Sequence, residues 1–293
     1  MVWKGGTELY KTRHAWAFLL PAIIFLMIFS IIPIFWVIYL GFTDYNVFSP
    51  AQWVGLENFE KLFNDPKFWK ALRNTVYYWA LVTPAITIAS LLLAVLVNQQ
   101  LIGIKLYRLA YYFPVLVSVV ITALLWKWMF ATDGVFNFVF SLIGLGPVPW
   151  LTSESTAMIS VAIVTVWQGL GYYMLIYLAG LQSVPNDLYE AAEIDGAGFW
   201  RKQWNITIPM LRPIIFFVSV ISTMGAFKEF TLMLVMTGGG PVNSTTTLVY
   251  LVFKEAFENI NMGYASAIAT VLFMLILIIT IINMKIQDQT DQQ

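Results

Sequence analysis

One polar segment sets this chain of 293 residues apart: Glu190-Ala191-Ala192-Glu193-Ile194-Asp195-Gly196, continuing to Ile206-Thr207-Ile208-Pro209. The segment is charged and long enough for two short helices, yet a long apolar stretch lies on either side of it. A membrane-embedded chain needs a reason to keep such a segment, and docking a soluble partner is the most economical one. An ordinary hydrated loop is the alternative, and composition alone does not separate the two interpretations.

The composition is that of a membrane protein. Hydrophobic residues make up 59% of the chain and charged residues 11%, whereas an average soluble protein carries about 25% charged residues. The mean hydropathy is +0.75. The net charge of zero gives no reason to expect a nucleic-acid partner. The absence of cysteine excludes disulfides, thiolate metal sites and a cysteine nucleophile, and we expect neither a metal nor a cofactor.

Six apolar stretches are long enough to cross a hydrocarbon layer of about 30 Å as helices. No loop between them is long enough to fold by itself, so we expect an all-α membrane protein with a single transmembrane domain over residues 1–293. The predicted spans are residues 15–40, 72–97, 109–130, 156–181, 213–236 and 263–284.

The distribution of Lys and Arg predicts that both termini are cytoplasmic, because cytoplasmic loops are enriched in these residues. In this orientation the inner segments hold nine of them and the outer segments five. The outer lysines alternate with acidic residues, which predicts an amphipathic surface helix around residues 59–69. The inner set is Lys4, Lys11, Arg13, Lys105, Arg108, Arg201, Lys202, Arg212 and Lys285, and the outer set is Lys61, Lys67, Lys70, Arg73 and Lys254.

The polar segment then lies on the cytoplasmic side. Residues 187–194 favour a short helix, and Gly196 to Gly198 allow a sharp turn before a second helix. Acidic residues precede the turn, and Arg201 and Lys202 follow it. A knob of this kind, with its acid on one limb, fits a basic cleft on a partner.

The spacing within this segment resembles the motif of binding-protein-dependent ABC importer permeases. That motif reads Glu-Ala-Ala, three residues, Gly, nine residues and Ile-x-Leu-Pro, and this chain matches it with Ile208 in place of Leu. The replacement conserves volume. Other strings resemble the carbohydrate-uptake (MalF-like) members: Phe18-Leu19-Leu20-Pro21, Gly55-Leu56-Glu57-Asn58-Phe59, Tyr112-Phe113-Pro114 and Leu181-Gln182-Ser183-Val184-Pro185.

The resemblance implies a type I ABC importer transmembrane domain in a bacterial cell (inner) membrane. It implies a second, MalG-like permease subunit, two ATPase subunits that bind ATP-Mg, and an extracytoplasmic sugar-binding protein. The chain itself is expected not to be an enzyme, because it contains no Gly-x-x-x-x-Gly-Lys-Ser/Thr phosphate loop. Residues 185–211 would form the ATPase-coupling loop, through Glu190, Ala191, Ala192, Asp195, Gly196, Ile206 and Pro209.

Two faces of predicted spans carry polar residues, which in a membrane usually face a protein interior or a water-filled path. Spacings of i, i+3, i+4 and i+7 place Thr165, Gln168, Gly169 and Tyr172 on one face of the fourth span. Helix packing is the alternative, because small and polar residues also serve there. The fifth span repeats the pattern with Ser222, Ala226 and Glu229. In the maltose permease these two helices contact the sugar, so the resemblance implies a solute site at these seven positions. Gly169, Tyr172 and Ser222 match that permease in type, whereas Thr165, Gln168, Ala226 and Glu229 depart from it, which implies a different sugar pattern.

Lys228 and Glu229 are adjacent opposite charges inside a span, and each would cost about 2.5–3.5 kcal/mol against lipid. Neighbouring helical residues point about 100° apart, so the two are poorly placed to pair with each other. An ion pair with a partner permease is the alternative to a contact with solute. After this span, Thr237-Gly238-Gly239-Gly240-Pro241 is interpreted as an outer gate or a docking surface for the binding protein, or as a helix stop.

Three functional classes compete. The first is the permease subunit of an ATP-driven importer of a sugar or glycoside, which works by alternating access. The second is an ion-coupled secondary transporter that uses Lys228 and Glu229, although the paired halves typical of that class are not visible. The third is an intramembrane hydrolase, and against it stands the absence of any His or Cys inside the predicted spans. The solute stays open, and an uncharged glycoside fits best.

Overall fold

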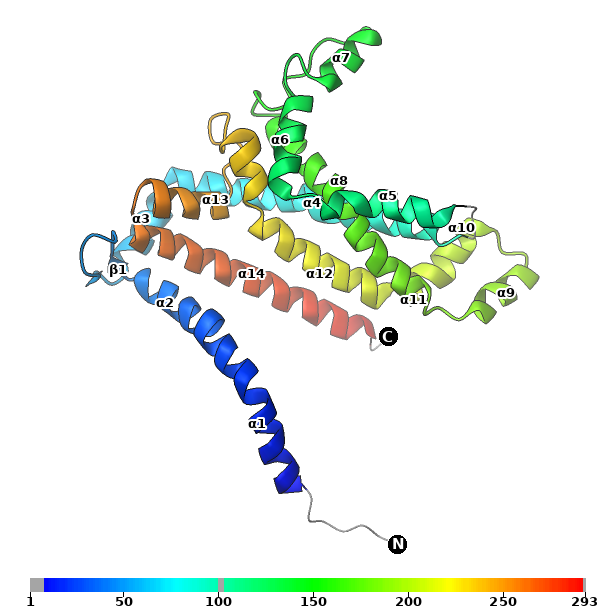
Figure 1. Cartoon of the computed structure of the whole chain (residues 1–293), viewed down its shortest axis with the longest axis horizontal. Helices are drawn as coiled ribbons and strands as arrows, with labels where there is room; N and C mark the ends of the chain where they lie inside the picture. The colour runs from blue at the N-terminus through cyan, green and yellow to red at the C-terminus, as the bar shows by residue number, and fades with distance from the viewer. Residues whose placement is uncertain (1–7, 100–102, 292–293) are drawn as a thin grey trace. The chain divides into compact units, whose positions relative to one another are not determined.

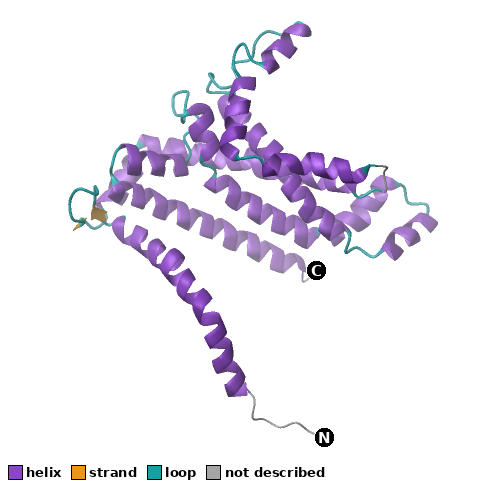
Figure 2. Ribbon diagram, in the orientation of Figure 1, coloured by secondary structure: helices purple, strands orange, loops and turns teal. Residues whose placement is uncertain are grey.

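The computed structural model describes the backbone of residues 8–99 and 103–291 and the side chains of residues 16–99 and 103–285. Lys4 and the side chains of Lys11 and Arg13 lie outside this range. The regular structure is almost entirely helical (Figures 1 and 2). Five helices are long and apolar enough to span a membrane: Trp16–Leu40, Pro66–Val97, Ala157–Leu181, Arg212–Thr237 and Met262–Lys285. A sixth span arises when Ile104–Leu116 and Val119–Met129 are taken together, although the two are bent by 97°.

The second long helix, α4 (Pro66–Val97), begins six residues before the predicted span. Its start is set by local chemistry, because the Asp65 carboxylate accepts a hydrogen bond from the Lys67 amide at 2.8 Å and Pro66 occupies the first turn. The surface helix expected around residues 59–69 is therefore shorter, and it corresponds to α3 (Glu57–Asn64).

The chain separates into two compact units, which are described in turn; a single domain over residues 1–293 stays a prediction. Unit 1 comprises residues 1–64 and 252–271. The side-chain amide of Asn58 donates to the carbonyls of Gly41 and Thr43 at 3.0 and 2.9 Å, which joins α3 to the end of the first span. The amide of Gly263 donates to the Tyr45 carbonyl at 3.0 Å. The elements of unit 1 are α1 (Glu8–Leu26), η1 (Met27–Ile31), α2 (Ile32–Leu40), β1 (Thr43–Asp44), β2 (Gln52–Trp53), α3 and η4 (Lys254–Glu258).

Unit 2 comprises residues 65–251 and 272–293 and contains the remaining spans. Both α13 (Leu248–Phe253) and α14 (Met262–Asp291) cross the boundary between the units. The other elements of unit 2 are α4, α5 (Ile104–Leu116), α6 (Val119–Met129), α7 (Val135–Leu142), α8 (Ala157–Leu181), α9 (Asn186–Ile194), α10 (Phe199–Lys202), η2 (Gln203–Thr207), α11 (Ile208–Met210), α12 (Arg212–Lys228) and η3 (Met233–Thr237).

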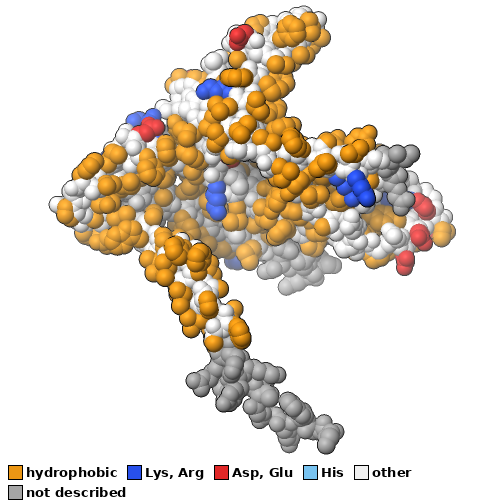
Figure 3. Space-filling model, viewed as in Figure 1, with side chains coloured by type: hydrophobic (Ala, Val, Ile, Leu, Met, Phe, Trp, Pro, Cys, Tyr) orange, Lys and Arg blue, Asp and Glu red, His pale blue; other side chains and the backbone are white. Residues whose placement is uncertain are grey.

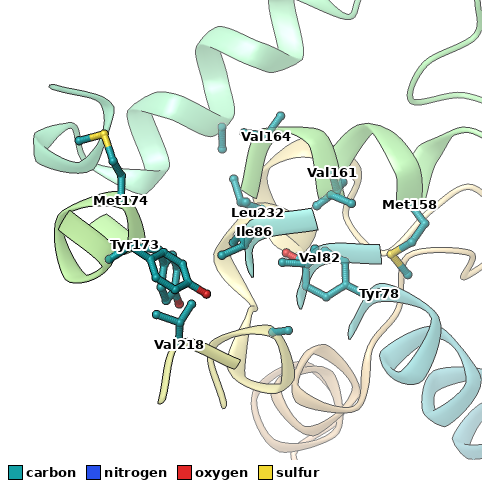
Figure 4. Close-up of a cluster of buried hydrophobic side chains, with 14 of the residues drawn as sticks. Tyr78, Val82, Ile86, Met158, Val161, Val164, Tyr173, Met174, Val218 and Leu232 are labelled. Carbon is teal, nitrogen blue, oxygen red and sulfur yellow. The ribbon is translucent and has the colours of Figure 1, made fainter. Parts of the chain in front are cut away.

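The core of unit 2 forms where α8 packs along α4, with α5 and α12 beside them (Figure 1). Buried aliphatic side chains on the two helices interdigitate at this contact. Figure 4 shows the cluster, which includes Tyr78, Val82 and Ile86 of α4 and Met158, Val161 and Val164 of α8.

The span expected at residues 109–130 is not straight. Its first part, α5, ends at Leu116, and Val117 adopts an extended backbone conformation with φ −80° and ψ 136°. Pro114 precedes this point. The Val117 amide donates to the Pro114 carbonyl at 3.2 Å, and the helical hydrogen-bond ladder ends at this extended residue, after which α6 starts in a new direction.

Gly171 allows α8 and α5 to approach closely, because a Cβ at this position would overlap the backbone of Tyr111 and Tyr112. We expect Gly171→Ala to push the two helices apart and to lower stability by about 1–3 kcal/mol. The melting temperature of the purified protein in detergent is the measurement. Gly146→Ala is the matched control, because a Cβ at Gly146 meets open space. Equal melting temperatures for both variants would contradict the close approach.

Candidate functional site

A cavity of about 280 Å³ lies among α4, α5, α8 and the chain around the end of α12, inside unit 2. All seven residues predicted for a solute site line it: Thr165, Gln168, Gly169, Tyr172, Ser222, Ala226 and Glu229. Six further residues complete the lining, namely Val82, Ile86, Val115, Tyr173, Gly225 and Leu232. The structure therefore brings the polar faces of the fourth and fifth spans together at one cavity, and their role in binding solute stays a prediction.

Thr165 is tied into the wall of the cavity. Its hydroxyl donates to the Val161 carbonyl at 3.1 Å and lies 2.5 Å from the Tyr78 hydroxyl. Tyr78 is fully buried, so Thr165 is the partner that satisfies its polar group. The Thr165 hydroxyl therefore serves the helix packing that the sequence left open as an alternative.

Gln168 holds the break between α5 and α6. Its side-chain amide nitrogen donates to the carbonyl of Val117 at 3.1 Å. This carbonyl belongs to the extended residue where α5 has ended, so no helical amide is in place to pair with it. Gln168 also lines the cavity.

Glu229 holds a second break. The helix α12 ends at Lys228, and Glu229 itself is extended, with φ −66° and ψ 123°. Its carboxylate accepts a hydrogen bond from the Leu232 amide at 2.9 Å and so caps the helical turns that follow. The fifth span was expected as one continuous helix, and the structure instead interrupts it at the residue predicted to contact solute.

Lys228 and Glu229 separate in space. Glu229 lines the cavity, whereas Lys228 is exposed and is not part of the lining. Within the described part of the chain Lys228 forms no ion pair. The sequence already placed the two side chains about 100° apart and assigned only Glu229 to the solute site. The end of α12 at Lys228 is the part that was not expected.

The aromatic wall of the cavity is larger than predicted. Tyr173 lines it beside Tyr172, and their rings meet edge to face with centroids 5.1 Å apart. Tyr173 lies four residues after Gly169, so helical spacing would have found it. Val82 and Ile86 of α4 carry no polar signal, and only the packing of α4 against α8 places them here.

The predicted coupling loop forms a helix-turn-helix knob. The helix α9 ends before Gly196, whose φ of +71° lies in the left-handed region. The ammonium of Lys202 pairs with the Glu193 carboxylate across the turn, and the hydroxyls of Tyr189 and Thr207 lie 2.9 Å apart. Acidic side chains gather around α9, at the right of the view in Figure 3.

The surface of this knob is acidic and apolar at once. Glu190 and Asp195 are exposed, as are Ala191 and Gly196, while Ala192 and Ile206 are half-buried. Ile194 is 88% exposed and Trp200 66%, which is unusual for large apolar side chains in water. A second cavity, of about 260 Å³, lies at the root of the knob and is lined by Val95, Asn98, Gln99, Leu181, Asn186, Tyr189, Phe199 and Gln203.

The segment from Thr237 to Pro241 is folded by hydroxyl contacts. The hydroxyls of Thr237 and Thr245 lie 2.7 Å apart, and Thr245 donates to the Gly240 carbonyl at 2.9 Å. Gly238 and Gly239 have positive φ angles of 58° and 79°. The segment ends η3, as a helix stop would, and leaves Val242 and Asn243 exposed at the tip.

Among the described side chains, no three His, Cys, Asp or Glu residues gather as a metal site would require. The model for the inner membrane component of binding-protein-dependent transport systems matches residues 13–290. This chain belongs to that family.

Relatives of this inner membrane component match it along nearly their whole length. The probable ABC transporter permease protein YurN of Bacillus subtilis (strain 168) is 36% identical, over 92% of this chain and 94% of the relative. The lactose transport system permease protein LacF of Rhizobium radiobacter is 34% identical, over 96% of both chains. The trehalose/maltose transport system permease protein MalF of Thermococcus litoralis is 32% identical, again over 96% of both.

A solved structure shares the fold. A chain of a bacterial ABC transporter involved in the import of the acidic polysaccharide alginate superimposes with a TM-score of 0.85 at 25% identity, over 96% of this chain and 97% of the other. This inner membrane component is thus a multi-pass inner-membrane protein with the fold of an ABC importer transmembrane domain. The sidedness of its termini stays a prediction from the Lys and Arg distribution.

Replacing Thr165 by Val tests the wall of the cavity. The change leaves the buried Tyr78 hydroxyl without its acceptor, and we expect a loss of about 1–3 kcal/mol of stability. Combining Thr165→Val with Tyr78→Phe removes both polar partners and should recover part of the loss. Thermal melting of the two single variants and the double variant measures this coupling, and strictly additive losses would refute it.

Proposed function

We propose that this chain is the permease subunit of an ATP-driven importer that moves a sugar or glycoside across the inner membrane by alternating access. The observation that carries the proposal is the cavity at which all seven predicted residues meet. The names of two relatives, a lactose transport permease and a trehalose/maltose transport permease, support a saccharide as solute.

The chemistry of the cavity favours an uncharged saccharide. Hydroxyl, amide and carboxylate oxygens line it together with two tyrosines, and sugar sites combine hydrogen-bonding groups with aromatic surfaces in this way. No Lys or Arg occurs among the described residues of the lining. A phosphate or carboxylate on the solute would therefore lack a cationic partner among the described residues of this cavity.

Occupancy of the cavity is linked to the shape of two spans. Gln168 and Glu229 face the cavity and also bond to the backbone at the breaks after α5 and α12. A solute hydroxyl that hydrogen-bonds to Gln168 or Glu229 either competes with the bond from that side chain to the backbone or fixes the side chain in place. Such a link lets a bound sugar bias the bundle toward one of its two access states.

In this proposal the energy for transport comes from ATP hydrolysis by partner subunits. Two ATPase subunits bind ATP-Mg and hydrolyse it, because the chain contains no phosphate loop. The knob with exposed Glu190, Asp195 and Ile194 inserts into an ATPase cleft, where both its charge and its apolar surface are covered. A second permease subunit completes the pathway, and an extracytoplasmic binding protein delivers the sugar near the tip of the Thr237–Pro241 segment.

Nothing in the family membership supports the ion-coupled alternative. Lys228 is exposed and outside the cavity lining, so only Glu229 of the two coupling residues in that hypothesis lies at the cavity. Uptake into proteoliposomes by this chain alone, without ATP, would restore it.

Glu229→Gln tests the solute site. The amide oxygen still accepts from the Leu232 amide, so the fold should persist, while a charged hydrogen-bond acceptor for the sugar is lost. We expect sugar uptake by the assembled transporter to fall roughly tenfold or more. Asp133→Asn, a carboxylate-to-amide change in an exposed loop, is the control. Normal uptake in a correctly assembled Glu229→Gln complex would remove Glu229 from the site.

Gly196→Ala tests the coupling knob. A side chain at a φ of +71° costs about 1–2 kcal/mol and alters the turn between α9 and α10. We expect weaker stimulation of ATP hydrolysis by the sugar-loaded binding protein, with near-normal insertion into the membrane. Gly198→Ala is the matched control, because Gly198 has an ordinary φ of −69° and open space around it. Equal stimulation in both variants would argue against the coupling role.

A further inference from the structure

A third cavity, of about 350 Å³, lies in unit 2 at the other end of α4 from the coupling knob. The first turns of α4 supply Lys70, Arg73, Asn74 and Tyr77 to its lining, and the rest comes from Glu154, Met158 and Ser244. None of these residues lines the cavity that contains Glu229. The two spaces are therefore separate sites on the same helix.

The walls of this outer cavity are fixed by hydrogen bonds. The ammonium of Lys70 donates to the Val242 carbonyl at 2.5 Å. The side-chain amide of Asn74 donates to the carbonyls of Asn243 and Thr246 at 2.8 and 2.9 Å. These contacts hold residues 242–246 against α4, so the cavity is a built feature and not a gap between loose loops.

Several polar groups remain unused inside it. Ser244 is only 8% exposed, and its buried hydroxyl has no hydrogen-bond partner. Arg73 forms no ion pair or side-chain hydrogen bond within the described part of the chain. The side-chain oxygen of Asn74 is left as an acceptor, and the ring of Tyr77 is 43% exposed. A buried hydroxyl without a partner is costly, which points to a ligand that supplies one.

The mixture of groups selects the class of ligand. Arg73 and Ser244 donate, Asn74 and Glu154 accept, and Tyr77 offers an aromatic surface. Glu154 lies 3.8 Å from Lys70 and offsets its charge, so Arg73 is the charged donor that a ligand would meet, and the Glu154 carboxylate can still accept from a ligand hydroxyl. A sugar hydroxyl both donates and accepts, and the C–H face of a sugar ring packs on an aromatic ring.

We propose that the outer cavity is a second saccharide site, which holds one sugar unit of the solute before it reaches the cavity at Glu229. The proposal rests on the proposed function and on the predicted orientation, in which the start of α4 and residues 242–246 face outward. One helix then presents the solute with two successive sites, at Arg73 and at Val82 to Ile86.

The test is equilibrium binding of radiolabelled maltose, trehalose and lactose to the whole transporter complex in nanodiscs without binding protein. We expect two classes of site for a sugar that is transported. Arg73→Met should weaken one class about tenfold or more, and Ser244→Ala should weaken the same class. Arg73 has no described partner, so its loss should not disturb folding. Lys67→Met is the control, because Lys67 is an exposed cation six residues before Arg73 on α4 and lies outside the lining.

The outcomes separate this proposal from the proposed function. One class of site that is weakened by Glu229→Gln and untouched by Arg73→Met overturns the outer site and leaves the importer intact. Binding of glucuronate or inorganic phosphate that depends on Arg73, without binding of neutral sugars there, overturns the assignment to a neutral saccharide. Sugar transport by the complex is measured in parallel, and its absence for every saccharide would contradict the proposed function itself.

Discussion

Hydrocarbon supplies no hydrogen bonds, so a backbone that leaves the helical conformation inside a membrane must find partners within the protein. This constraint explains the centre of unit 2. Two spans break there, and the side chains of Gln168 and Glu229 bond to the backbone groups of Val117 and Leu232 at those breaks. The same two side chains line the cavity, so the residues that make the breaks tolerable are also those that a solute meets.

The helix α4 organises unit 2 along its length. Its start lines the outer cavity at Lys70 to Tyr77, its middle lines the central cavity at Val82 and Ile86, and its end lines the cavity below the coupling knob. From Lys70 to Val97 the helix extends roughly 40 Å at 1.5 Å per residue. Three cavities with different linings therefore share one helix, which packs against α8.

Much of the site was predictable because helical periodicity is local. Spacings of three and four residues place Thr165, Gln168, Gly169 and Tyr172 on one face whatever the helix packs against. The hydrogen-bond partners of these side chains were not predictable. Thr165 is saturated by Tyr78, which lies 87 residues away, and Gln168 reaches Val117, which lies 51 residues away. Contacts over such separations depend on how spans pack, and no pattern within one span encodes them.

Composition and periodicity were enough to predict the apolar spans and the polar faces, and the Glu190–Pro209 spacing was enough to show the resemblance to importer permeases. Each of these features depends on residues that are close together in the chain. The tertiary structure alone showed that α12 ends at Lys228 and that the Glu229 carboxylate caps the turns that follow while it lines the cavity. It alone assembled the outer cavity, whose walls join α4 to residues 154 and 244. Cavities arise between elements, and their lining is set by packing.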